Sequence, residues 1–442
     1  MTTSIDVPVI FGYQIIEQIY FGSKTLVYRA IREKDCRPVV IKFLASEYPS
    51  FNELLQFRNQ YIITKNLQIS GILPPLSLEP YHNGYALVME DFGGISLREY
   101  NRCWGRQYES SSQTVFLQEF LSIALQLVDT LEDLYNHRII HKDIKPANIL
   151  INPDTKQVKL IDFSIASLLP KEIQEIKSPN ILEGTLAYIS PEQTGRMNRG
   201  IDYRSDFYSL GATFYELLTG KLPFTSDEPM ELVHCHIAKT PEPIQNQEIP
   251  PVISDIVMKL MAKNAEDRYQ SALGLKHDLE TCLSQIQATG KIAYFPIAQR
   301  DICDRFIIPE KLYGRENEVE QLLAAFDRIA GISHDSLSLA DNHGKSELIL
   351  VAGFSGIGKT AVVNEVHKPI VKQRGYFIKG KFDQFNRNIP FSAFIQAFRD
   401  LMGHLLTESD KSIKQWQDKI LLALGDNAQV IIEVIPELER IR

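Results

Sequence analysis

The first third of the chain shows the hydrophobic pattern of strands with one buried face. Apolar and polar residues alternate, with many β-branched residues, over 13–43, and this period of two is typical of strands. Gly22 and Pro38 interrupt the run, so it predicts a small antiparallel sheet. Apolar residues then recur at helical spacing over 51–67, and strand character returns over 85–89.

Beyond Val115 the pattern is mainly helical. Amphipathic segments at 115–137, 205–219 and 251–263 are separated by turns rich in Gly, Pro and Asp, which predicts a helical lobe behind a strand-rich one. The periodicity weakens over 284–312, as in a linker. A second domain is therefore expected to begin near the end of this stretch.

Length and composition agree with two folded domains. The 442 residues exceed what one core usually supports, while 44% hydrophobic and 23% charged residues are ordinary for globular proteins. A net charge of -8 argues against nucleic acid as a partner. No leader is apparent over 1–8 and no long uninterrupted apolar run follows, so we expect no membrane segment and a cytoplasmic location. The five scattered cysteines predict neither disulfides nor a zinc site.

Candidate chemistry begins with the run IHKDIKPANIL at 140–150. It places Asp143, Lys145 and Asn148 at a spacing that resembles the catalytic loop of protein kinases, and the lysine two residues after the aspartate is similar to the serine/threonine type. The resemblance implies that Asp143 accepts the proton of the substrate hydroxyl. It also implies that Lys145 steadies the transferring phosphoryl group and that Asn148 holds Mg²⁺. Phosphoryl transfer needs such positioned cations because charge develops on the phosphate oxygens.

Two further segments resemble kinase landmarks. Leu160–Ser164 is similar to the D-F-G element, with Ser164 in the place of glycine, and implies that Asp162 chelates the metal. Val39–Lys42 resembles the strand whose lysine contacts the α and β phosphates of ATP, so Lys42 is the expected nucleotide anchor. The same resemblance assigns other positions to the nucleotide pocket, namely Gly22, Val27, Met89, Glu90 and Phe92.

The chain departs from the kinase pattern at two places. The glycine-rich loop over 19–27 keeps only its middle glycine, Gly22, so its backbone approaches phosphate less closely. In the following helix, the register puts Gln60 where the partner of Lys42 is usually a glutamate, while Glu53 is about two turns away. A docking module that binds ATP without phosphotransfer is therefore an alternative hypothesis to an active kinase.

Later landmarks also resemble those of kinases, in structural roles. Ser190, Pro191 and Glu192 stand at the A-P-E end of an activation segment. The resemblance implies that Asp206 supports the catalytic loop from below, and that Arg268 pairs with Glu192.

A second nucleotide site is indicated by the full G-x-x-x-x-G-K-[ST] motif over 353–360. An apolar run at 348–352 precedes it and predicts a buried strand. Loop and helix N–H groups bind phosphates in such motifs, the lysine reaches the β and γ groups, and the threonine ligates Mg²⁺. The expected nucleotide-binding residues are Gly353, Gly356, Gly358, Lys359 and Thr360, with Thr360 also a metal ligand.

Upstream, Tyr313–Glu318 resembles the entry motif of AAA-type ATPases. Kinase and ATPase in this order are similar to large bacterial, chiefly cyanobacterial, hybrid signalling proteins, whose later parts include a GAF sensor and a histidine kinase. Such domains, absent from this chain, are possible partners, beside a protein substrate with a serine or threonine acceptor. P-loop ATPases also need a strand that ends in an acid. The late candidate is Val430–Glu433, where the apolar spacing favours helix over strand.

The predicted fold is thus an α+β bilobal protein kinase fold, followed by an incomplete α/β P-loop NTPase domain. The expected boundaries are 10–285 for the kinase domain, 286–312 for a linker and 313–442 for the N-terminal part of an AAA-type ATPase domain. ATP and Mg²⁺ are the expected cofactors. The predicted function is phosphorylation of protein serine and threonine hydroxyls, with the ATPase as a regulatory module.

Overall fold

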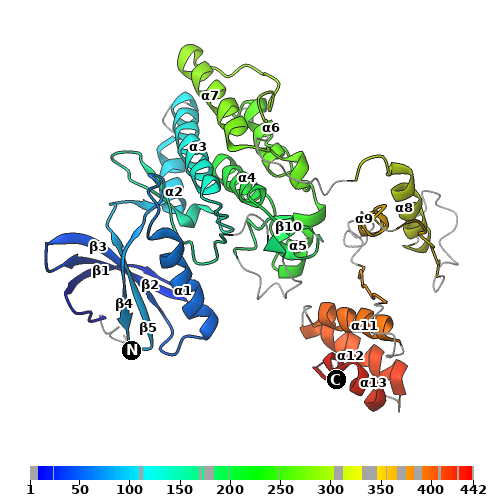
Figure 1. Ribbon diagram of the computed structural model, residues 1–442. Helices are drawn as coiled ribbons and strands as arrows, with labels where there is room; N and C mark the ends of the chain where they lie inside the picture. Colours follow the sequence, from blue (N-terminus) through cyan, green and yellow to red (C-terminus); the bar gives the residue numbers. More distant parts are fainter. Residues whose placement is uncertain are drawn as a thin grey trace.

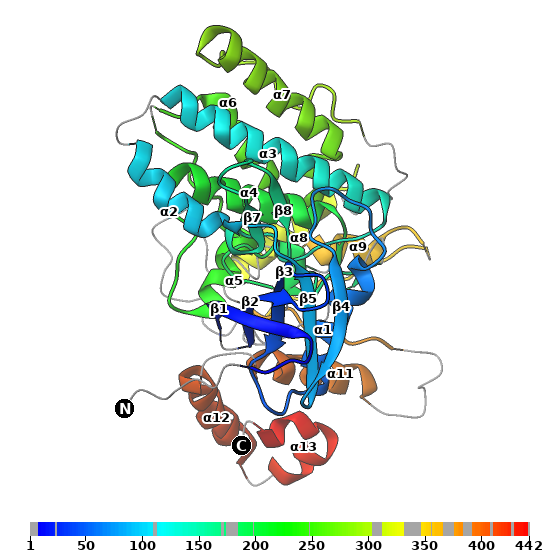
Figure 2. The same cartoon turned by 90° about the vertical axis from the view of Figure 1, so that its left-hand side faces the viewer.

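A computed structural model describes residues 8–22, 24–108, 113–168, 172–173, 184–197, 199–246, 248–302, 312–330, 346–354, 356–365, 375–382, 391–406, 410–425 and 428–440. The strand-rich and helix-rich lobes predicted from the pattern are both present, and Figures 1 and 2 show them as two neighbouring groups, one of strands and one of helices.

The first lobe is a five-stranded antiparallel sheet with one helix against it. The strands lie in the order β1-β2-β3-β5-β4, and α1 packs against β4 and β5. The helix begins at a capping box in which Ser50 and Glu53 bond to each other's backbone. The elements are β1 (Tyr13–Phe21), β2 (Thr25–Arg32), β3 (Arg37–Leu44), α1 (Phe51–Thr64), β4 (Pro75–Tyr81) and β5 (Gly84–Glu90).

The second lobe is helical and holds the largest apolar core of the described chain. The lobe also contains a three-stranded sheet, β6-β7-β8, and a two-stranded one, β9-β10. Its elements are β6 (Ile95–Ser96), α2 (Leu97–Tyr108), α3 (Gln113–Asn136), η1 (Pro146–Asn148), β7 (Ile149–Ile151), β8 (Val158–Leu160), β9 (Glu172–Ile173), η2 (Pro191–Thr194), β10 (Gly200–Ile201), α4 (Arg204–Thr219), α5 (Pro229–Ala238), α6 (Pro251–Leu260), η3 (Ala265–Asp267) and α7 (Ala272–Thr289).

Helix α3 is apolar because it lies in the core of the helical lobe. Among the described residues it is the one helix long and apolar enough to cross a membrane by length and composition alone. Leu121, Ala124 and Leu134 are fully buried in the core of the helical lobe, and α3 packs along α7. A central core helix passes the same length and composition test as a membrane span, so this finding supports a membrane assignment only weakly.

The chain after α7 folds back onto the helical lobe instead of leaving it. Gly290 ends the helix in a left-handed conformation, φ 71°. Phe295 and Ile297 then pack against the core. Both carboxylate oxygens of Asp301 accept hydrogen bonds at the start of α7, from the backbone N–H groups of Gln270 and Ser271 at 2.8 and 2.9 Å. We call residues 291–302 the strap. The stretch predicted as a linker from 286 thus starts inside α7 and continues in contact with the kinase lobe.

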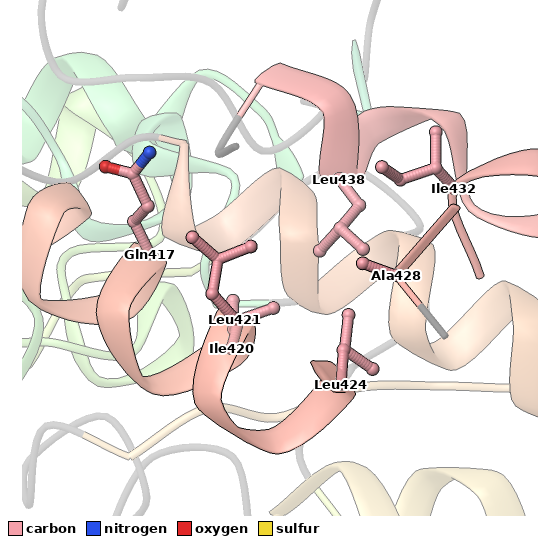
Figure 3. Close-up of a pocket in the computed structure, with 7 residues that line it drawn as sticks. All are labelled: Gln417, Ile420, Leu421, Leu424, Ala428, Ile432 and Leu438. Atoms are coloured by element: carbon pink, nitrogen blue, oxygen red, sulfur yellow. The ribbon is translucent and has the colours of Figure 1, made fainter. Parts of the chain in front are cut away.

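The remaining described residues are mostly helical. The elements are α8 (Glu316–Ala330), α9 (Lys359–Glu365), α11 (Ser392–Leu405), α12 (Asp410–Leu424), α13 (Ala428–Val434) and η6 (Pro436–Arg440). Around Met402, Leu405 and Ile432, the last four of these elements share a small apolar core. Figure 3 shows the apolar cavity between α12 and α13, lined by Leu421, Leu424 and neighbours. Its volume of about 10 Å³ is no more than one water needs, so it is a packing defect and not a ligand site.

Two predictions for this part have clear outcomes. The predicted buried strand at 348–352 is wrong, because the segment has no strand assignment and Leu348 and Leu350 are 98% and 89% exposed. A strand forms only against a partner strand, and none pairs with it among the described residues. The preference for helix at Val430–Glu433 is confirmed, because these residues lie in α13 and Glu433 is exposed.

Candidate active site

Lys42 lies on the central strand of the first lobe, at the face that meets the second lobe. It pairs across the sheet with Val27 of β2 and Leu87 of β5. The lysine is 8% exposed, and a buried ammonium group must find polar partners. Its Nζ donates to Oε1 of Gln60 on α1 at 3.1 Å and to Oδ1 of Asp162 at 3.0 Å.

The helical register had singled out Gln60, and the resemblance to the D-F-G element had singled out Asp162. Gln60 occupies the position opposite Lys42, so its placement is confirmed, and it supplies an amide oxygen where a carboxylate would carry charge. Glu53 instead accepts hydrogen bonds from the hydroxyl and the backbone N–H of Ser50, and these bonds hold its pKa below the ordinary value. Partial enclosure acts to raise the pKa of Asp162, but the charge of Lys42 and hydrogen bonds from Lys42 and Ser164 lower it to about 2.

Asp162 has a left-handed backbone, φ 67°, and Ser164 is not among the residues with positive φ. Serine therefore fits the place of the usual glycine here without backbone strain. The adjoining Phe163 is buried against His141, with ring centroids 4.7 Å apart. Asn59 of α1 reaches the same segment and donates from Nδ2 to the carbonyls of Ser164 and Ala166. The segment that follows Asp162 is thus tied to α1 through the side chain of Asn59.

A buried carboxylate holds the backbone of the catalytic-loop segment through hydrogen bonds. Asp206 of α4 accepts the backbone N–H groups of His141 and Lys142, both at 2.8 Å. This contact confirms the structural role expected for Asp206. Lys142 has φ 68°, a conformation that non-glycine residues rarely adopt and that the surrounding bonds must hold.

Asp143 lies at the centre of a compact set of donors. Its Oδ2 accepts from Lys145 Nζ at 2.6 Å and from Asn148 Nδ2 at 2.8 Å, while Oδ1 accepts from the Thr185 hydroxyl at 2.9 Å. Lys145 also donates to that hydroxyl at 2.6 Å. The structure therefore brings together the three polar residues that the motif at 140–150 singled out, and adds Thr185.

Asn148 and Asp162 are suited to a hard cation. The Asn148 amide nitrogen is used by the carbonyl and carboxylate of Asp143, which leaves its oxygen as the atom available to a metal. The two residues are linked by a hydrogen bond from the N–H of Ile161 to the carbonyl of Asn148. Carboxylate and amide oxygens are ligands that Mg²⁺ accepts, so this pair fits the predicted ion.

The positions expected at the nucleotide pocket lie on or next to β2 and β5, the two strands that flank β3, with Val27 in β2. Met89 and Glu90 end β5, and Phe92 follows, with its carbonyl accepting from Asn152 Nδ2 at 3.0 Å. Gly22 closes the turn between β1 and β2 by donating its N–H to the carbonyl of Thr25 at 3.0 Å. The Tyr20 ring lies so close to Gly22 that an added Cβ would meet it at 2.6 Å, so a side chain here would displace the ring.

The end of the activation segment is anchored by a buried ion pair. Arg268 donates to both oxygens of Glu192, at 2.6 and 2.8 Å, and both side chains are almost fully buried. The expected pairing is confirmed. Because the pair is bidentate, it fixes the segment's end in geometry as well as in charge.

The second predicted site is present as a loop and a short helix. Gly356 and Gly358 have positive φ, 80° and 93°, as a phosphate-binding turn of glycines requires. Lys359 begins α9, and its Nζ folds back to the carbonyls of Gly353 and Phe354 at 2.8 and 2.7 Å. Thr360 is exposed in the next position. Ser355 of the motif lies outside the described residues.

Three residues that touch this machinery were not assigned a role from the sequence: Asn59, Thr185 and Gln193. Thr185 follows Gly184 in a segment already compared with kinases, so its position after that glycine was the available signal. Asn59 adjoins Gln60 and could have been found from the same helical register. The side chain of Gln193 reaches the carbonyl of Lys142, a contact between residues far apart in the sequence.

A five-stranded lobe facing a helical lobe, with these side chains between them, defines the protein kinase class of fold. A family model described as protein kinase domain matches residues 13–279, which is more than half of the chain, so the chain belongs to the protein kinase family. A model described as AAA ATPase domain matches residues 311–440. Both families use ATP with Mg²⁺, which supports the predicted cofactors.

Three proteins similar to this chain are named as kinases. The chain is 34% identical over 412 residues to hybrid signal transduction histidine kinase G of Dictyostelium discoideum, covering 73% of this chain and 12% of that protein. It is 31% identical over 281 residues to the serine/threonine-protein kinase PknB of Mycolicibacterium smegmatis, covering 60% and 42%. It is 32% identical over 274 residues to the serine/threonine-protein kinase PrkC of Bacillus subtilis, covering 61% and 40%. The chain thus spans less than half the length of each of these relatives.

Proposed function

We propose that this chain transfers the γ-phosphoryl group of ATP to serine and threonine hydroxyls of proteins. The observation that carries the proposal is the set of contacts around Asp143, in which Lys145, Asn148 and Thr185 hold one carboxylate at the interface of the two lobes. This arrangement sits beside the Lys42–Asp162 ion pair. The relatives named as serine/threonine-protein kinases support the same acceptor class.

In this proposal each residue has a physical task. Lys42 orients the α and β phosphates of ATP from the sheet, and Asn148 and Asp162 hold Mg²⁺, which neutralises charge on the phosphate oxygens when bound. Asp143 takes the proton of the acceptor hydroxyl as the oxygen attacks. Lys145 stays within reach of the same point and stabilises negative charge there. Val27, Met89, Glu90 and Phe92 with Gly22 enclose the nucleotide base and its phosphates.

One observation favours the alternative of a docking module that binds ATP. Gln60 gives Lys42 a neutral oxygen, which accepts a hydrogen bond but does not neutralise the ammonium charge as a carboxylate does. Against this stands the intact donor set of Asp143, Asn148 and Asp162, which a docking module does not need. We therefore place catalysis first.

The second domain is proposed as an ATP-binding regulatory module in signal transduction. Gly353, Gly356, Gly358 and Lys359 would hold phosphates, and Thr360 would ligate Mg²⁺. The kinase unit would run from residue 10 through the strap to residue 302, and the module from 313. We further propose that both act in the cytoplasm, with protein substrates and with sensor or histidine kinase domains as partners.

Labelled ATP tests the proposed reaction. The purified chain is incubated with γ-labelled ATP, Mg²⁺ and a general protein acceptor, and the labelled amino acids are separated after hydrolysis. Label in phosphoserine and phosphothreonine supports the proposal. The docking module would be favoured if the chain binds ATP but no label appears in a range of protein acceptors or in the chain itself.

A further inference from the structure

Gln193 is a buried amide whose two ends are both engaged. It lies in η2 near the end of the activation segment and is 2% exposed. Its Oε1 accepts from the backbone N–H and the hydroxyl of Ser190, at 3.1 and 2.8 Å. Its Nε2 donates to the backbone carbonyl of Lys142 at 2.8 Å. The first contacts are local, whereas the last crosses to the catalytic loop.

The carbonyl that Gln193 holds belongs to the peptide unit joining Lys142 to Asp143. The N–H at the other side of that unit donates to Nδ1 of His141 at 3.2 Å. Burial lowers the pKa of His141, so its ring is neutral, with Nε2 donating to the carbonyl of Ile161 at 3.0 Å and Nδ1 free to accept. Side chains therefore form hydrogen bonds with both the carbonyl and the N–H of this peptide unit.

Rotation of this unit would redirect the carboxylate of Asp143. A turn of the peptide plane changes ψ of Lys142 and φ of Asp143 together, because both bonds flank the plane. The left-handed backbone of Lys142 is unfavourable for a residue with a side chain, so it needs external bonds to persist. Asp206 holds the N–H of Lys142, and Gln193 holds its carbonyl.

We propose that Gln193 is a positioning residue for catalysis, which aims Asp143 by fixing the Lys142–Asp143 peptide unit. The inference rests on the proposed function. The Glu192–Arg268 ion pair fixes the end of the activation segment, and Gln193, the next residue, holds the peptide unit that precedes Asp143. In this proposal the ion pair therefore contributes to the orientation of Asp143.

The test uses the full chain with Gln193→Glu and the matched control Ser190→Ala. The glutamate keeps an oxygen for both Ser190 donors but replaces the Nε2–H with an acceptor that faces the carbonyl of Lys142. The control removes the Ser190 hydroxyl contact and leaves the bond to Lys142. We expect kcat to fall about tenfold or more in Gln193→Glu, since small errors of aim cost that much. The KM for ATP should stay within about twofold, because Lys42 and the metal ligands are untouched. Ser190→Ala should keep kcat within about threefold of wild type.

Gln193→Met provides a second variant of similar length without an added charge, and the same loss in kcat is expected from it. If the wild type is active and both Gln193 variants keep its kcat, the role of Gln193 is overturned. A loss in which the thermal midpoint and the KM for ATP change in proportion to kcat would also overturn it, since that is the result of a merely structural residue. A wild type that transfers no phosphoryl group would instead contradict the proposed function itself, and the inference with it.

Discussion

At the scale of single residues, the environment of Lys42 differs most from the kinase pattern. A buried lysine holds its position through charge as well as through hydrogen bonds, and only one of its two partners here, Asp162, is a carboxylate. Gln60 holds the ammonium with a neutral oxygen. The orientation of the Lys42 side chain toward the phosphates therefore depends more on Asp162 than on Gln60, and Asp162 is also a proposed ligand of the metal.

We predict that Gln60→Glu raises the rate of phosphotransfer. A carboxylate at this position adds the attraction of opposite charges to the hydrogen bond that Lys42 now makes with a neutral amide oxygen, and frees Asp162 for the metal. The expected gain is several-fold in kcat/KM for ATP, measured by initial rates at varied ATP. Gln60→Ala is the control and should lower the rate, because it leaves Lys42 with one partner. An unchanged or lower rate in Gln60→Glu would mean that the amide is already sufficient.

Which residues could be predicted depends on whether their partners are close in the sequence. Asp143, Lys145 and Asn148 lie within one short motif, and the helical register reached Gln60 from its apolar neighbours. Thr185 and Gln193 contact Asp143 and Lys142 across 42 and 51 positions of the chain. Such contacts exist only once the activation segment has folded against the catalytic loop, so a local pattern can place Thr185 in that segment but cannot predict the contacts themselves.

At the scale of elements, the strap is the feature that the hydrophobic pattern did not reveal. Its apolar residues are too irregularly spaced to predict a helix or strand, yet three of them, Ile292, Phe295 and Ile297, cover the core beside α7. Asp301 completes the start of the helix by accepting two backbone N–H groups and the Ser271 hydroxyl. Gly274 faces it so closely that an added Cβ would lie 2.5 Å from its carboxylate.

We predict that Asp301→Ala destabilises the kinase lobe. The change leaves helix-start donors without their acceptor, at a cost of about 1–3 kcal/mol. A lobe of this size should lose roughly 2–10 °C in its thermal midpoint. The measurement is thermal unfolding of the full chain, with Asp301→Asn as the control that keeps one side-chain oxygen and should lose less. Equal midpoints for wild type and Asp301→Ala would show that the strap contributes nothing to the lobe.

At the scale of the whole molecule, the sequence predicted the kinase domain far better than the second one. Each lobe of the kinase completes its own core, so periodicity and structure agree. The run at 348–352 was read as a buried strand from its composition, but strand formation depends on a pairing partner that composition cannot supply. In the same domain the apolar spacing at Val430–Glu433 did indicate a helix, because α13 packs one face on α11 and α12.

We predict that the P-loop module binds ATP but hydrolyses it slowly. Hydrolysis needs an acid at the end of a second strand to complete the metal shell and orient water, and the late candidate, Glu433, is exposed on a helix. The measurement uses the full chain carrying Asp143→Asn, to remove kinase turnover, with and without Lys359→Ala. The lysine change should remove one class of ATP-binding site while the low hydrolysis rate changes little. Rapid hydrolysis that disappears with Lys359→Ala would contradict this account.

The central claim is that the carboxylate of Asp143 serves catalysis and not the fold. The most direct measurement is transfer of γ-labelled phosphate to protein by wild type and by Asp143→Asn, with ATP binding and thermal unfolding measured on the same samples. We expect transfer to fall by about 10²–10⁴-fold, the usual contribution of a general base. ATP affinity and the thermal midpoint should stay near those of wild type, because Lys42, Asp162 and the core are untouched. Transfer by Asp143→Asn within a few-fold of wild type would contradict the account.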